Sequence, residues 1–119
     1  MIRQGNVYWL DLGRPLGSEP GFVRPYVVLQ NNVFNDSPIQ TAVICGLTTN
    51  LRRSKSPGNV LLDVGEAGLP GRSVVNVTQL VTVDKALLTD PVGHLTAERV
   101  HAILAGVMDV LAPAVEGVG

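Results

Sequence analysis

Val75-Asn76-Val77-Thr78-Gln79-Leu80-Val81-Thr82-Val83 is the stretch that decides the fold. Apolar and polar residues largely alternate along it, a pattern typical of a β-strand that packs one face inward. The alternation predicts that Asn76, Thr78 and Thr82 share the face that does not pack inward. A single strand needs partners, and the rest of the sequence contains similar runs.

Several other short β-type runs are separated by Gly, Pro, Asn and Asp residues, which favour turns. Together with the run above, the predicted strands span Asn6 to Leu12, Tyr26 to Gln30, Thr41 to Leu47, Asn59 to Val64, and Ser73 to Val83. Short strands at such spacing predict an antiparallel small barrel or curled sheet.

The period changes near the C-terminus. Apolar residues recur at i, i+3, i+4, i+7 and i+11, the stripe of an amphipathic helix that packs on a sheet; they are Val100, Ile103, Leu104, Val107 and Leu111. Thr96 can cap the start of this helix and Pro113 can end it. Arg99 stands where a capping box would have Glu or Gln. We therefore expect a mainly β domain with a C-terminal α-helix.

Composition limits the possible functions. The 119 residues are 45% hydrophobic, which fits one domain over residues 1–119 with a single core. No apolar stretch approaches a membrane span and no signal-peptide core follows Met1, so we expect a cytoplasmic protein without membrane contact. Cys45 is the sole cysteine, which excludes an intrachain disulfide and predicts a buried small hydrophobe rather than a metal ligand.

Charge is uneven along the chain. The formal net charge of −1 argues against a protein that coats nucleic acid without selectivity. Lys and Arg nevertheless outnumber Asp and Glu in residues 1–57, whereas the reverse holds in residues 58–119. Arg52, Arg53 and Lys55 form a local positive segment, which is either a phosphate-attracting loop or a solvated turn.

Two polar segments adjoin predicted strands. Gly17-Ser18-Glu19-Pro20-Gly21-Phe22-Val23-Arg24-Pro25 delivers a carboxylate and a guanidinium just before the apolar run Tyr26-Val27-Val28-Leu29. Thr48-Thr49-Asn50 ends the run that begins at Thr41. Charged and hydroxyl groups held at the ends of rigid strands are a common way to bind an anionic substrate.

These residue types fit metal-independent cleavage of RNA. That reaction needs a base for the ribose 2′-OH, stabilisation of the phosphorane and a proton for the leaving 5′-oxygen. Arg24 suits the second task because its planar guanidinium stays charged and can hold two phosphate oxygens. Thr48 can donate to the same phosphate or orient the attacking group. Glu19 is the nearby group that can act as a base at neutral pH.

Other catalytic sets are missing from the sequence. It contains no Walker loop, GxGxxG, HExxH or Cys/His cluster, so we expect no cofactor and no metal. His94 and His101 lie near or on the predicted helix and offer little material for a two-histidine mechanism. Each candidate also has a structural alternative, in which Arg24 pairs with Glu19 and Thr48 satisfies a strand-end carbonyl.

The Gly-Ser-Glu…Arg-Pro loop, followed by Leu47-Thr48-Thr49-Asn50, resembles the MazF/PemK family of toxin endoribonucleases over nearly the whole chain. The resemblance implies an SH3-like small barrel of the CcdB/MazF/PemK type, a homodimer and a small antitoxin protein as partner. It implies a sequence-selective endoribonuclease that cleaves single-stranded RNA, with Arg24 and Thr48 as the functional pair. Alongside the catalytic residues Arg24, Thr48 and Glu19, we expect RNA contacts from Ser18, Thr49, Asn50, Arg52, Arg53, Lys55 and Gln79.

The chain also departs from the family pattern. Many members carry Asp-Ser before the long strand and Gln-Ile-Arg within it, where this sequence has Arg72-Ser73 and Gln79-Leu80-Val81. The second Arg of the family is therefore replaced by Val81, and Arg72 can restore part of its charge. Two alternatives stay open: a CcdB-type toxin that binds DNA gyrase without cleaving anything, and a nuclease-dead binding module.

Overall fold

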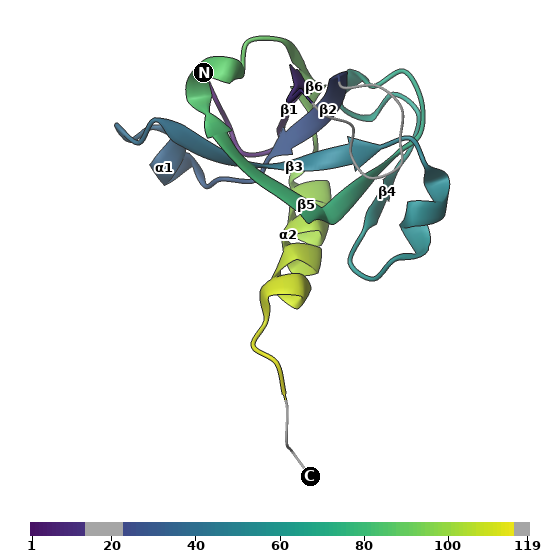
Figure 1. Ribbon diagram of the computed structural model, residues 1–119. Helices are drawn as coiled ribbons and strands as arrows, with labels where there is room; N and C mark the ends of the chain where they lie inside the picture. Colours follow the sequence, from purple (N-terminus) through teal and green to yellow (C-terminus); the bar gives the residue numbers. More distant parts are fainter. Residues whose placement is uncertain (14–22, 116–119) are drawn as a thin grey trace.

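The computed structural model describes residues 1–13 and 23–115, and its core is a six-stranded curled sheet with one long helix (Figure 1). The strands are β1 (Asn6–Asp11), β2 (Val23–Val28), β3 (Thr41–Thr48), β4 (Val60–Leu62), β5 (Ser73–Asp84) and β6 (Pro91–His94). The helices are α1 (Asn32–Asn35), α2 (Ala97–Leu111) and three 3₁₀ turns, η1 (Leu51–Lys55), η2 (Glu66–Gly68) and η3 (Lys85–Leu87).

Every strand pairing in the sheet is antiparallel, in the order β4-β5-β3-β2-β1-β6. The expected fold class is thus confirmed: a mainly β chain with a C-terminal helix, whose sheet curls as a small barrel requires. The five predicted strands are present, but their ends are shifted. For example, β2 begins at Val23 rather than Tyr26. A sixth strand, β6, was missed because Pro91-Val92-Gly93-His94 is short and carries a single large apolar residue.

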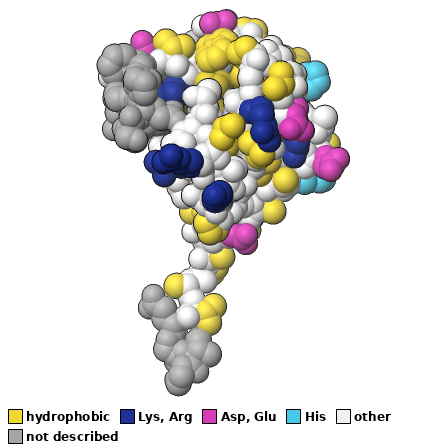
Figure 2. All heavy atoms as spheres, turned by 90° about the vertical axis from the view of Figure 1, so that its right-hand side faces the viewer, with side chains coloured by type: hydrophobic (Ala, Val, Ile, Leu, Met, Phe, Trp, Pro, Cys, Tyr) yellow, Lys and Arg dark blue, Asp and Glu magenta, His cyan; other side chains and the backbone are white. Residues whose placement is uncertain are grey.

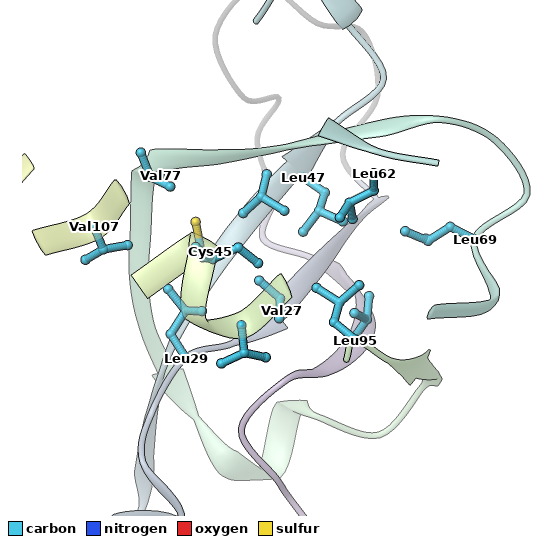
Figure 3. Close-up of a cluster of buried hydrophobic side chains, with 13 residues drawn as sticks. Val27, Leu29, Cys45, Leu47, Leu62, Leu69, Val77, Leu95 and Val107 are labelled. Atoms are coloured by element: carbon cyan, nitrogen blue, oxygen red, sulfur yellow. The ribbon is translucent and has the colours of Figure 1, made fainter. Parts of the chain in front are cut away.

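Two clusters of buried side chains occupy the two faces of the sheet. One is largely aliphatic, is covered by α2 and includes Val27, Leu47 and Val77 (Figure 3). The other lies on the opposite face and includes Tyr26, Val28 and Ile44. Because neighbours along a strand point to opposite faces, β2 supplies Val27 to the first cluster and Tyr26 and Val28 to the second.

Helix α2 forms where the apolar stripe predicts it. Thr96 caps the helix by accepting a hydrogen bond from the Arg99 N–H at 3.3 Å. Val100 and Ile103 are buried against the sheet. Leu111 is 63% exposed, so the prediction that it packs on the sheet was wrong; the last turn of α2 extends past the sheet edge. The helix ends at Leu111, before Pro113.

The alternation predicted for residues 75–83 breaks in the middle of β5. Cys45 lies opposite Leu80 and Leu47 lies opposite Val75, so a single residue of β3 faces four residues of β5. This bulge bends the strand and frees Asn76–Gln79 from regular pairing with β3. Asn76 and Thr78 do share a face, because the Thr78 hydroxyl donates to Asn76 Oδ1 at 3.0 Å.

The segment between η1 and β4 docks on α2 through two glycines. A Cβ added to Gly106 would lie 2.1 Å from the carbonyl oxygen of Gly58, so the two backbones touch. Gly58 has φ +82°, a conformation that L-residues rarely adopt. This contact fixes the position of the residues that follow β3 relative to the helix.

Candidate active site

Arg24 is placed by the start of β2. It lies opposite Leu10 of β1, and the next residue, Pro25, lies opposite Trp9. Pro25 has no backbone N–H, and the recorded ladder between β2 and β3 starts only at the following residue, Tyr26. Arg24 is 8% exposed, which is unusual for an arginine and is typical of a side chain held in place by its surroundings.

The pairing of β2 with β3 places the strand start that carries Arg24 beside the strand end that carries Thr48. Tyr26 lies opposite Gly46, and each step along β2 is matched by one step back along β3, as Val27–Cys45 and Val28–Ile44 show. Arg24 lies two residues before Tyr26 and Thr48 two residues after Gly46, so extending this register past its last pair sets Arg24 opposite Thr48. By the alternation of side chains, both belong to the face of the sheet opposite α2. The two polar segments of the sequence analysis therefore adjoin neighbouring strands at the same end of the β2–β3 pair.

Thr48 is 5% exposed and its hydroxyl oxygen accepts a hydrogen bond from the Asn50 N–H at 3.0 Å. The hydroxyl proton can still be donated to another group, such as a phosphate oxygen. The Asn50 side chain in turn accepts from the Arg52 N–H at 3.2 Å and caps η1. Asn50 therefore has a structural task in the turn that leads from the site to η1.

The basic segment expected to attract phosphate lies in η1. Arg52, Arg53 and Lys55 are exposed, and so is Arg72 on the approach to β5. Figure 2 shows the side of the molecule to the right in Figure 1, on which some Lys and Arg side chains are surrounded by uncharged surface and others adjoin Asp or Glu side chains. Exposed cations attract an anionic chain over about 8 to 10 Å in physiological salt.

Arg99, by contrast, is engaged in a structural ion pair. Its guanidinium donates to both oxygens of Glu66, at 2.9 and 2.8 Å, and joins η2 to α2. The Asp63 carboxylate lies 3.8 Å away. The hydrogen bond from Arg99 lowers the pKa of Glu66, and the same bond raises the pKa of Arg99.

Some predicted site residues cannot be placed. Ser18 and Glu19 lie outside the described residues, so the catalytic base stays a prediction. Thr49 is exposed next to Thr48, and Gln79 is half-buried in the bulge of β5. His94 lies in β6, separated from β2 by β1 in the sheet, and His101 is exposed on α2.

Cys45 is buried as expected, and burial raises the pKa of its thiol to about 12. The thiol donates to the carbonyl of Asn76 at 3.1 Å, where β5 bulges. Within residues 1–13 and 23–115, no three His, Cys, Asp or Glu side chains come together as metal ligands. The described part of the chain also contains no helix of the length and apolarity that a bilayer crossing demands.

One hollow was not foreseen. A cavity of about 390 Å³ lies between the η1–β4 segment, the bulge of β5 and the last turn of α2. Its lining includes Arg53, Asn76 and Asp109. Asp109 was missed because it comes from a helix more than 50 residues beyond Arg53 and belongs to no local motif.

Comparison with known proteins agrees with this arrangement. The model of the family described as PemK-like, MazF-like toxin of type II toxin–antitoxin system matches residues 3–111. Endoribonuclease MazF6 of Mycobacterium tuberculosis is 40% identical over 111 residues, which cover 93% of this chain and 97% of the relative. Endoribonuclease EndoA of Bacillus subtilis is 36% identical over 104 residues, covering 87% of this chain and 88% of the relative.

Solved structures show the same fold. A mycobacterial endoribonuclease in complex with its cognate antitoxin superposes with a TM-score of 0.76 at 26% identity, covering 97% of this chain and 100% of the other. MazF from Deinococcus radiodurans superposes with a TM-score of 0.73 at 20% identity, covering 94% and 97%. The second likeness supports the fold alone.

Proposed function

Because this chain belongs to the PemK-like, MazF-like toxins of type II toxin–antitoxin systems, we propose that it is an endoribonuclease that cleaves single-stranded RNA at selected sequences. The observation that carries the proposal is the antiparallel pairing of β2 with β3, whose register, extended by two residues, sets Arg24 opposite Thr48. The two curated relatives above are named endoribonucleases, so a gyrase-binding function is not favoured.

In the proposed reaction, the ribose 2′-OH attacks the adjacent phosphate and the 5′-oxygen leaves. The products carry a 2′,3′-cyclic phosphate and a 5′-OH. Arg24 and Thr48 hold the phosphate oxygens as negative charge builds on the phosphorane. Both side chains are nearly buried, so a phosphate that reaches them loses most of its water and charge–charge attraction strengthens.

Proton transfer is assigned to other groups. A guanidinium stays protonated at every physiological pH, which makes Arg24 a poor acid or base. We propose that Glu19, Thr48 or the substrate's own groups accept the proton of the 2′-OH and deliver a proton to the leaving 5′-oxygen. No step requires a metal ion.

The remaining expectations follow from the family. We propose that the chain forms one toxin domain over residues 1–119, acts in the cytoplasm, forms a homodimer and is neutralised by a small antitoxin. The structural relative solved with its cognate antitoxin supports the last point. The last turn of α2 supports a protein partner too, because Met108 and Leu111 are 66% and 63% exposed.

The test is cleavage of a long single-stranded RNA by the purified protein in EDTA, with fragment ends mapped. We expect cuts at a recurring short motif, full loss of cutting in Arg24→Ala and Thr48→Ala, and no change in Thr82→Ala, whose side chain is exposed elsewhere on β5. Arg24→Lys keeps the charge and loses the planar fork, so it should cut far more slowly. Intact RNA with folded wild-type protein would favour the nuclease-dead alternative, in which Val81 replaces the Arg of the family.

A further inference from the structure

The cavity beside α2 is distinct from the Arg24–Thr48 site. Asp109 and Val110 of α2 line one side of it, and Arg53, Ser56 and Pro57 line another. Helix α2 covers the face of the sheet opposite the one to which Arg24 and Thr48 belong. Figure 1 shows the loop that carries η1 hanging beside α2 below β5. A volume of about 390 Å³ falls within the range of roughly 300 to 1,000 Å³ that small-molecule sites occupy.

The floor of the cavity is held rigidly. Asn59 accepts from the Val77 N–H at 2.9 Å and donates to the Arg53 carbonyl at 2.9 Å, so its side chain ties η1 to the bulge of β5. Thr78 donates its proton to Asn76 Oδ1. This leaves the Asn76 amide N–H groups and the lone pairs of the Thr78 hydroxyl able to bond a ligand.

Opposite charges face this cavity without pairing. Among the described residues, Arg53 and Asp109 both line the hollow, yet neither forms an ion pair with the other or with any other side chain. A ligand that presents an anion to Arg53 and hydrogen-bond donors to Asp109 would satisfy both ends. Pro57 and the 43%-exposed Val110 supply apolar surface for a flat ring between them.

We propose that this cavity binds a guanine nucleotide of the substrate RNA outside the scissile phosphate. Arg53 contacts its phosphate, and Asp109 accepts hydrogen bonds from the guanine N1–H and N2–H₂. Guanine is favoured because its Watson–Crick edge presents two adjacent donors, which match the two oxygens of a carboxylate. Single-stranded RNA is commonly recognised through that edge. The cavity thereby selects sequence while the Arg24–Thr48 site performs the chemistry, and this inference rests on the proposed nuclease function.

The test uses RNA that carries 2′-O-methyl groups and so binds without being cut. Guanine is replaced one position at a time by inosine, which lacks the N2 amino group. At one position of the RNA, replacing guanine with inosine should weaken binding to the wild-type protein about tenfold. That is the effect of losing one hydrogen bond to a charged group. Asp109→Asn should bind the guanine and inosine RNAs equally well. Glu98→Gln makes the same change of charge on α2 outside the cavity and should keep the tenfold difference.

Arg53→Gln separates phosphate binding from base selection. It should weaken the binding of guanine and inosine RNAs by the same factor. It should also lower the slope of log affinity against log salt by about 0.7. Retention of the guanine preference in Asp109→Asn would overturn the proposal while leaving the nuclease intact. If Asp109→Asn and Arg53→Gln weakened binding of the antitoxin but left RNA binding unchanged, the guanine proposal would be wrong and the cavity would bind a protein instead.

The two proposals can fail separately. If uncut RNA keeps the Asp109-dependent guanine preference but cleavable RNA stays intact, the nuclease function is wrong and the base pocket stands. If the wild-type protein binds no RNA, both are wrong.

Discussion

Gly106→Ala has two opposing effects on stability: higher helix propensity stabilises the protein, and a steric overlap destabilises it. The structure shows which effect is larger. In the interior of a helix, replacing Gly with Ala normally stabilises a protein by about 1 kcal/mol. At Gly106 the new methyl would lie 2.1 Å from the carbonyl oxygen of Gly58 and 2.9 Å from its carbonyl carbon. Those atoms belong to the backbone, so they cannot turn aside as a flexible side chain would.

Relieving this overlap requires α2 and the η1–β4 segment to separate by roughly 1 Å. Overpacking of this kind costs about 1 to 3 kcal/mol, and more where backbone must move. The steric cost exceeds the gain in propensity, so we expect Gly106→Ala to lower the free energy of unfolding by about 1 to 2 kcal/mol. The displaced segment directly follows η1, which carries Arg53, so RNA binding should weaken as well.

Urea unfolding of the two proteins, followed by circular dichroism, measures the change in stability. Ala105→Gly, an exposed site on the same helix, gives the propensity scale in this protein and should destabilise it by about 1 kcal/mol. Gly71→Ala, which would meet no atom within 4 Å, should be close to neutral. If Gly106→Ala proved more stable than the wild type, the Gly58–Gly106 contact would not exist as described.

Three further outcomes are expected. Arg99 lowers the pKa of Glu66 below 4.5, so their pairing stabilises the fold above the pKa that Glu66 has in the unfolded chain. This stabilisation is lost as the pH falls through the pKa of Glu66 in the folded protein. Glu66→Gln should therefore lower the free energy of unfolding by about 1 kcal/mol at pH 7 and flatten the fall in urea midpoint between pH 5 and 3. A Glu66→Gln protein with the wild-type pH dependence would contradict this assignment. With a pKa of about 12, the buried Cys45 thiol should react with a disulfide reagent at pH 8 only as fast as the protein unfolds, so prompt reaction of native protein would refute its burial. Arg52→Gln and Lys55→Gln should each reduce the salt slope of RNA binding by about 0.7 without changing the cleavage motif, and a changed motif would show that they contact bases.

Local periodicity predicted most of the fold. Stripe residues such as Val100 and Ile103 pack where the helix pattern placed them, because burial is what fixes an amphipathic helix. Leu111 follows the same pattern yet is exposed, because periodicity identifies a helix face but not where the sheet beneath it ends. The bulge of β5 was equally invisible, since its cause is the pairing with β3 and not the sequence of β5 alone.

The candidate site divides in the same way. The sequence could nominate Arg24 and Thr48 because each lies in a recognisable motif at a strand end, and their roles in the site stay predictions. Asp109 and Asn76 line one cavity through the docking of α2 beside η1, a contact made possible by Gly58 and Gly106. No sequence pattern relates two glycines 48 positions apart in the chain, so this part of the molecule required the structure.

Because Val81 replaces the second Arg of the family pattern, the segment between η1 and β4, which docks on α2, should matter more for RNA recognition. Val81 lies opposite Ile44 and packs with the cluster on the face away from α2, so its position in the sheet adds apolar contact and no charge. Under the proposed function, positive charge for an RNA chain comes largely from the exposed basic residues of η1 and from Arg72. Because a loop holds charges in place only as firmly as it is anchored, recognition in this protein should depend on the Gly58–Gly106 contact more than in relatives that keep an Arg within the sheet.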